Sequence, residues 1–213
     1  MPMPRHIEPT KIFTSICPLK DVDGFHPLNV GKLNMHSRTS LFSQPEFIPC
    51  TPLAILRLLK ESGIRLSGKV AIVIGRSNLV GIPIVSLLRQ RDCTVIHAHS
   101  FTTTLPHLVA QADIVVAACG VPELIQGSWL KKGCVVIDVG INYVQENGQG
   151  RRRIVGDVCY ESARRKASVI TPVPGGVGPM TVTMLLQNVI DSFERRISSS
   201  YERRKVINTV VSE

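Results

Sequence analysis

The chain has 213 residues, a mass of 23.4 kDa and a formal net charge of +9, and 44% of its residues are hydrophobic. This length allows one full hydrophobic core with a small appendage. No apolar run approaches the roughly 18 residues of a membrane-spanning helix, and residues 1–6 lack the apolar stretch of a signal peptide. We therefore expect neither a membrane protein nor a secreted one.

The cysteines and histidines give no sign of a metal site. Neither residue type shows ligand spacing, and the cysteines contain no Cys-x-x-Cys pair. We expect most of the cysteines to behave as small buried hydrophobes in a reducing compartment. The cytoplasm is the expected location, with an organelle as the alternative. The cysteines are Cys17, Cys50, Cys93, Cys119, Cys134 and Cys159.

The positive charge falls in short clusters rather than in one tract. Residues 151–153 lie in a predicted glycine-rich loop, residues 164–166 on a predicted helix, and residues 195–196 and 203–205 near the C-terminus. Solvated faces and a frayed tail account for most of this charge. Because no aromatic residues interleave with the clusters, nucleic-acid binding is not expected. The charge favours small anionic ligands.

The first 50 residues are rich in proline and turn residues and show little periodicity. A helix is predicted from Thr51, the expected N-cap, with Pro52 at its first turn and Gly63 as its stop. Short apolar runs and helical patterns then alternate. The sequence predicts strands at 70–74, 93–98, 114–118, 135–139 and 169–170, and helices after Gly81 through Arg91, at 105–111 and at 180–195.

This order predicts an α/β fold. The strand runs are apolar almost throughout, which is typical of parallel strands buried on both faces. Strands that alternate with helices form a Rossmann-like, doubly wound parallel sheet.

The turn after the first predicted strand is a candidate phosphate site. The strand ends at Gly75 and the next helix begins after Gly81, where free N–H groups and the helix dipole attract an anion. Ser77 and Val80 occupy the second and third glycine positions of the common dinucleotide motif, so a plain βα turn remains an alternative.

The end of the second strand indicates which dinucleotide would bind. The segment 97–102 contains no carboxylate to bind a ribose 2′-hydroxyl, as an NAD site usually has. Arg76 could face a 2′-phosphate with Ser100 as a hydroxyl partner, which favours NADP. An exposed turn arginine and a helix-capping serine are the alternatives.

Residues 171–181 form a loop rich in glycine and proline, Thr-Pro-Val-Pro-Gly-Gly-Val-Gly-Pro-Met-Thr. Few side chains shield such a backbone, so it can approach a flat ligand closely. Thr181 is the expected cap of the helix that follows. A purely structural loop is the alternative.

Six motifs in order resemble one family. They are Asp21-Val-Asp23-Gly-Phe-His26-Pro, Pro49-Cys-Thr51-Pro52, Val73-Ile-Gly75-Arg-Ser-Asn, Val136-Ile-Asp138-Val-Gly140-Ile-Asn142, Val155-Gly-Asp157-Val and the 171–181 loop. Together they resemble the bifunctional methylenetetrahydrofolate dehydrogenase/methenyltetrahydrofolate cyclohydrolase family, up to about Arg195.

The resemblance implies roles for particular residues. NADP would be lined by Gly75, Arg76, Ser77, Ser100 and Ile141, with Thr51 and Thr181 near the nicotinamide. Folate would contact Asp23, which would hold the 2-amino-4-oxo edge of the pterin, and the wall made by Pro174, Gly175, Gly176, Val177 and Gly178. Asp138 and Asp157 are expected to organise loops rather than to catalyse.

The resemblance also implies a domain order and an activity. Residues 1–50 would be the remnant of a smaller N-terminal α/β folate-binding domain, 51–195 the NADP domain, with its last helix (181–195) packing back toward the folate domain, and 196–213 a polar tail. The activity would be NADP-dependent oxidation of 5,10-methylenetetrahydrofolate to 5,10-methenyltetrahydrofolate, then hydrolysis to 10-formyltetrahydrofolate. A homodimer through the cofactor domain is expected.

One part of the family pattern is absent. The Tyr-x-x-x-Lys helix and the glutamine beside a Leu-Pro-Leu-Pro stretch, which supply the catalytic groups, do not occur in these positions; residues 1–4 resemble only the end of that stretch. A fragment of an active enzyme, a natural truncation and a chain completed by another polypeptide are the three explanations. We expect little cyclohydrolase activity from this chain alone, and a non-catalytic NADP-binding homologue is the alternative function.

Overall fold

A five-stranded parallel sheet lies at the centre of the computed structural model, which describes residues 4, 6–36, 44–146 and 151–211. Its strand order is β2-β1-β3-β4-β7, so the order reverses between β1 and β3. The predicted α/β class with a Rossmann-like parallel sheet is confirmed. The strands are β1 (Val70–Ile74), β2 (Thr94–Ala98), β3 (Ile114–Ala117), β4 (Val135–Asp138) and β7 (Val169–Ile170).

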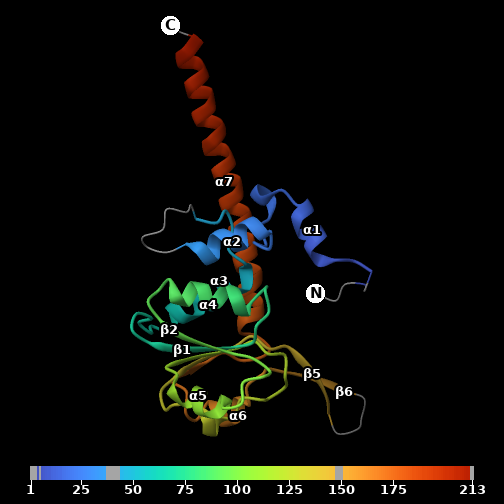
Figure 1. Ribbon diagram of the computed structural model, residues 1–213, viewed down its shortest axis with the longest axis vertical. Coiled ribbons are helices and arrows are strands. Elements are labelled where there is room, and N and C mark those ends of the chain that lie inside the picture. Colours follow the sequence, from blue (N-terminus) through green and yellow to red (C-terminus); the bar gives the residue numbers. More distant parts are fainter. Residues whose placement is uncertain (1–3, 5, 37–43, 147–150, 212–213) are drawn as a thin grey trace.

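The apolar strands bury both of their faces. Successive residues of β1 alternate between two cores: Ala71 and Val73 face one, and Ile72 and Ile74 face the other. The first core is covered by α3 (Cys50–Glu61) and α4 (Gly81–Arg89), and the second by α5 (Leu105–Gln111), α6 (Tyr160–Ala163) and the 3₁₀ turn η2 (Gly127–Trp129). Figure 1 shows α3 and α4 on one side of the sheet and α5 and α6 on the other.

Two predicted helix caps are wrong. Helix α3 begins at Cys50 with Pro49 as its N-cap, so Thr51 lies inside its first turn. Helix α7 (Val177–Val211) begins four residues before Thr181, whose hydroxyl donates to the Val177 carbonyl at 3.0 Å. In both cases the helix begins before the hydroxyl residue, after Pro49 in α3 and after Gly176 in α7.

The basic clusters at 151–153 and 164–166 are also placed differently from the prediction. The first belongs to strand β6 (Arg151–Val155), which pairs antiparallel with β5 (Asn142–Glu146) in a separate two-stranded hairpin. The second follows α6, which ends at Ala163, instead of lying on a helix.

The described residues ahead of α3 form helices and contain no strand, so the described part of the expected α/β remnant is helical. These elements are α1 (Pro9–Ser15), the 3₁₀ turn η1 (Pro18–Lys20) and α2 (Pro27–Met35). They lie beside the first half of α7, which rises from the sheet and continues to Val211 (Figure 1), through most of the segment expected to be a tail.

Residues 1–3 and 212–213 and the side chains of 203–205, on which some of the sequence expectations fall, lie outside what the structure describes. Within the described residues, no helix is both long enough and apolar enough to cross a membrane.

Candidate functional site

Two glycines shape the turn between β1 and α4. Gly75 has a φ of +125°, and a Cβ placed there would collide with the Ala118 carbonyl. A Cβ on Gly81 would collide with the Gly75 carbonyl. Only glycine fits at either position, because backbone occupies the space that a side chain would fill. The turn therefore lies tightly against the carboxyl edge of the sheet, at the point where the strand order reverses.

The expected cofactor residues on this edge are open to solvent. Arg76, Ser77 and Ser100 are all exposed. The Ser77 hydroxyl accepts from the Leu79 N–H at 3.2 Å, which fixes the shape of the turn. The guanidinium of Arg76 lies 5.4 Å from the ring centre of Phe101, the neighbour of Ser100. The structure thus brings Arg76 and Ser100 to adjoining turns, as a 2′-phosphate site requires.

The glycine-rich loop forms one wall of a cavity of about 290 Å³. Ile141, 60% exposed, lies on this cavity together with Pro174 through Gly178. The loop is attached to β4, because the Thr171 hydroxyl accepts from the Asp138 N–H at 2.8 Å and its N–H donates to the Val136 carbonyl. Residues expected to line cofactor and folate therefore share one space.

Two buried aspartates hold the base of this cavity together. Asp138 accepts from the N–H groups of Gly140, Asp157 and Val158 at 2.9–3.0 Å. Burial raises the pKa of Asp138 to about 6, although these three donors oppose the shift. Asp157 accepts from the N–H groups of Cys119 and Gly120 and from the Asn142 amide. Both carboxyl groups are engaged with backbone, as the expected loop organisers should be.

Thr51 and Thr181 meet from opposite ends of the chain. The Thr181 hydroxyl lies 3.3 Å from that of Thr51, at the contact between α3 and α7. Both were expected near the nicotinamide, and the structure brings them together with 130 residues between them. Asn188, about two turns further along α7, donates to the carbonyls of Val22 and Ile48 at 2.7 and 3.1 Å.

Asp23 lies in a turn that a second aspartate organises. Asp21 is buried and accepts from the N–H groups of Phe25 and His26 and from the Asn29 amide. Burial raises the pKa of Asp23, with the charge of Asp21 as a further cause. Its carboxyl oxygen lies 4.0 Å from the sulfur of Cys50, beside Thr51.

The sequence analysis missed the supporting residues Asp21, Asn29 and Asn188. The Asp-x-Asp spacing of residues 21 and 23 was the available signal for the first. The contacts of Asn188 span 140 residues or more, and no local pattern indicates them.

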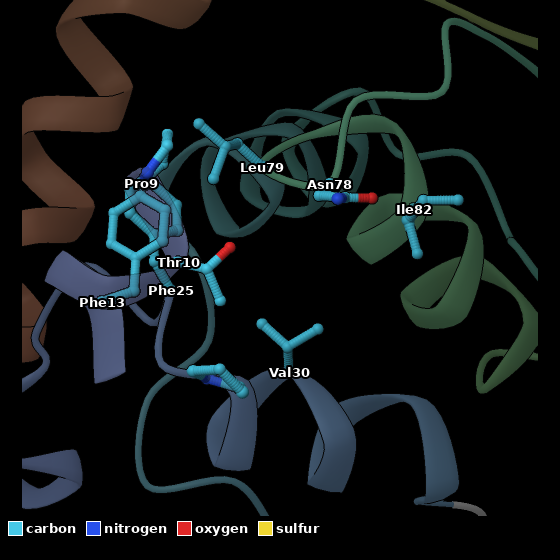
Figure 2. A pocket seen from close by; sticks show the side chains of 9 residues that line it. Pro9, Thr10, Phe13, Phe25, Val30, Asn78, Leu79 and Ile82 are labelled. Atoms are coloured by element: carbon cyan, nitrogen blue, oxygen red, sulfur yellow. The ribbon is translucent and has the colours of Figure 1, made fainter. Parts of the chain in front are cut away.

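A larger, mostly apolar cavity of about 590 Å³ lies behind the turn between β1 and α4. Figure 2 shows Pro9, Thr10 and Phe13 of α1 on one side and Asn78 and Ile82 on the other, with Val30 of α2 below. The N-terminal helices therefore face the turn between β1 and α4 across this cavity.

Comparison with known proteins agrees with this geometry. Residues 49–197 match the tetrahydrofolate dehydrogenase/cyclohydrolase family in its NAD(P)-binding domain. The chain is 51% identical over 196 residues to the mitochondrial bifunctional protein FolD 1 of Arabidopsis thaliana, covering 92% of this chain and 54% of that protein. It is 50% identical to the bifunctional protein FolD of Geotalea daltonii, covering 92% and 66%.

Solved structures show the same likeness. The Trypanosoma brucei methylenetetrahydrofolate dehydrogenase-cyclohydrolase, solved with NADP and an inhibitor, superposes with a TM-score of 0.86 at 42% identity, covering 92% of this chain and 66% of that one. The Campylobacter jejuni enzyme gives 0.83 at 45% identity with the same coverage. The chain spans between about half and two thirds of these relatives. It belongs to the tetrahydrofolate dehydrogenase/cyclohydrolase family and carries the NAD(P)-binding domain of that family.

Proposed function

We propose that this chain binds NADP at the carboxyl edge of its sheet and takes part in one-carbon folate metabolism. The reaction would be oxidation of 5,10-methylenetetrahydrofolate to 5,10-methenyltetrahydrofolate, followed by hydrolysis to 10-formyltetrahydrofolate. The observation that carries the proposal is the pair of glycines, Gly75 and Gly81, at which a side chain would collide with backbone. The relatives named FolD and the NADP-bound trypanosomal structure support it.

The residues on this edge suit NADP. At the start of α4 the Gly81 N–H would face the pyrophosphate, since no side chain caps the helix, the Ile82 N–H is donated to the Ser77 carbonyl and Pro83 has no N–H. Arg76 and Ser100 would bind the 2′-phosphate, and Ser77 would complete that end of the site. Ile141 would lie against the nicotinamide half, with Thr51 and Thr181 nearby.

Folate would lie between the glycine-rich wall and the Asp23 turn. Ionised Asp23 would accept two N–H groups from the pterin edge, and this pairing offsets the burial that raises its pKa. Residues 174–178 would offer a flat backbone surface to the ring system.

The chain's main contribution to the first step would be alignment. NADP⁺, when bound, accepts the hydride. Ile141 and residues 174–178 would hold the two ring systems in reacting geometry and exclude water from between them. Hydrolysis also needs a group that handles protons. The Tyr-x-x-x-Lys spacing in these 213 residues, Tyr201 to Lys205, lies near the C-terminus and not at the family's position, and we propose that this chain alone turns over slowly.

Titration separates binding from turnover. We expect NADP to bind the wild-type chain in a calorimetric titration, and Gly81→Ala to abolish binding because the new Cβ displaces the turn. Gly31→Ala in α2, where a Cβ meets nothing within 4 Å, is the matched control and should bind normally. A wild-type chain that binds neither NADP nor NAD would refute the proposal.

Turnover is measured by NADPH formation from methylenetetrahydrofolate. Intact NADP binding with very slow NADPH formation agrees with a chain that lacks the proton-handling group. Complete absence of turnover, even at high enzyme concentration, would instead favour a non-catalytic NADP-binding homologue.

We also propose that the chain forms a homodimer through its cofactor domain. The antiparallel hairpin β5–β6 stands apart from the main sheet and exposes Tyr143, which is 67% exposed. Light scattering coupled to gel filtration measures the mass directly, and a monomer at micromolar concentration would contradict the proposal.

A further inference from the structure

Two contacts join the turn after β1 to the turn after β2. The His97 ring lies 3.0 Å from the Gly75 carbonyl through its Nε2 atom. The guanidinium of Arg76, one residue after Gly75, lies over the ring of Phe101, four residues after His97, at 5.4 Å from the ring centre. Both contacts join the same two turns, so the β1–α4 turn and the end of β2 form one connected surface.

The turn that carries Phe101 is itself fixed by local hydrogen bonds. The Phe101 N–H donates to Nδ1 of His99 at 3.2 Å, and the Thr102 N–H donates to the His99 carbonyl at 2.8 Å. The Thr102 hydroxyl accepts from the His99 N–H at 3.0 Å. The rings of His99 and Phe101 also pack edge to face at 6.3 Å. The position of the Phe101 ring is therefore defined even though the ring is 77% exposed.

Hydrophobic burial does not explain an aromatic ring in this position. The ring contributes little to the core, and its defined contacts are with Arg76 and His99. A free arginine side chain occupies many rotamers, and ordering it weakens any ion pair that it forms. Stacking on a fixed ring removes that freedom before a ligand arrives, while the N–H groups at the edge of the guanidinium stay available.

We propose that Phe101 is a positioning residue that holds the Arg76 guanidinium where the 2′-phosphate of NADP binds, and that it thereby increases the preference for NADP over NAD. This inference rests on the proposed function, because it concerns the same dinucleotide site. Phe101 acts through Arg76 and not through the nicotinamide end, so its effect is confined to cofactors that carry the 2′-phosphate.

Matched substitutions of Phe101 test the idea. Phe101→Leu keeps an apolar side chain but removes the aromatic face, and Phe101→Tyr keeps the face. We expect Phe101→Leu to weaken NADP binding about two- to fivefold, and to leave the Kd for NAD unchanged within error. Phe101→Tyr should bind both dinucleotides like the wild-type chain. Because the side chain is exposed, neither change should alter the unfolding transition.

A double-mutant cycle with Arg76→Met identifies the route of the effect. Arg76→Met alone should lose more NADP affinity than Phe101→Leu, and adding Phe101→Leu to Arg76→Met should cost nothing further. Additive losses, equal losses for NADP and NAD, or no loss in Phe101→Leu would each overturn the inference while leaving NADP binding in place. Failure of the wild-type chain to bind either dinucleotide would overturn the proposed function as well.

Discussion

Two regions of the molecule are built in different ways. The first, the cofactor half, is the parallel sheet with helices α3, α4, α5 and α6, and the second consists of α1 and α2 with the outer half of α7. Each β1 side chain from Ala71 to Ile74 is at most 2% exposed, whereas α1 buries no residue at all. Helix α2 buries only Asn29 and Leu33. Between the two regions lies the 590 Å³ cavity of Figure 2, where α1 faces the cofactor turn without close packing.

Helix α7 belongs to both regions. One face packs on α3 and includes the half-buried Met184 and the buried Asn188. A second apolar face, offset around the helix, is open. Its exposed side chains repeat at helical spacing and are Val182, Leu186, Val189, Ile190, Phe193 and Ile197. The cofactor half thus supplies most of its own core, to which α2 adds Leu33, and the stability of the chain should be concentrated there.

The largest expected effect is on the free energy of unfolding, when a leucine is replaced by alanine in each of the two regions. Leu88 of α4 is 0% exposed and Leu186 of α7 is 59% exposed. Leu88→Ala should lower the free energy of unfolding by about 2–5 kcal/mol, because it leaves a cavity in the core. Leu186→Ala should change it by less than about 0.5 kcal/mol. Urea unfolding of both variants measures the difference.

A comparable loss in Leu186→Ala would show that the open face of α7 is covered in solution. In that case the comparison between the two regions would no longer describe the molecule. A concentration-dependent unfolding midpoint would then identify self-association as the reason.

The next effect is a pH dependence that originates in the cofactor half. The pKa of Asp138 rises from 3.8 to about 6 in the folded chain, chiefly through burial. The folded state therefore binds a proton more tightly than the unfolded state. The contribution of Asp138 to stability is fully present below about pH 4 and is lost as the pH rises through 6, by up to about 3 kcal/mol.

Comparison with Asp138→Asn isolates this group from the other carboxylates. The stability difference, wild type minus variant, should fall between pH 4 and pH 7. If it rises instead, the three N–H donors from Gly140, Asp157 and Val158 outweigh burial and hold the carboxylate ionised.

The contrast between the regions also explains what the sequence could predict. Strand β1, helix α5 and strand β7 were predicted to the residue, because β-branched runs and amphipathic spacing report burial directly. The hairpin β5–β6 was missed because its strands pair with each other outside the core, so exposed Tyr143 and Arg153 break any hydrophobic alternation. The residues of α7 that follow Arg195 are at first mainly polar. The apolar periodicity that predicts the helix up to Arg195 therefore does not predict its continuation.

The same distinction holds for the candidate site. Gly75 and Gly81 were found because a tight turn demands glycine at fixed positions. Ser100 and Arg76 followed from their places after two neighbouring strands. The contacts of Phe101 and Asn188 join residues that are far apart in the sequence. Phe101 contacts Arg76, 25 positions away, and Asn188 contacts Val22, 166 positions away. Local sequence patterns cannot indicate such contacts.

The smallest of the expected effects concerns the link between the two regions. The buried Asn188 side chain donates to the carbonyls of Val22 and Ile48, and so attaches the Asp23 turn to α7. Asn188→Ala leaves both acceptors without this donor and should cost about 1–2 kcal/mol. Gln187→Ala, which removes an exposed amide paired only within the helix, is the control and should be near neutral.

Hydrogen exchange shows where the Asn188→Ala loss falls. We expect faster exchange in the segment 18–35 and unchanged protection in β1 and β3, because those strands draw their stability from the two cores on either side of the sheet. Equal loss of protection in the strands would mean that the N-terminal helices and the cofactor half unfold as one unit. In that case the N-terminal helices would contribute to the stability of the NADP site as well as to the folate side.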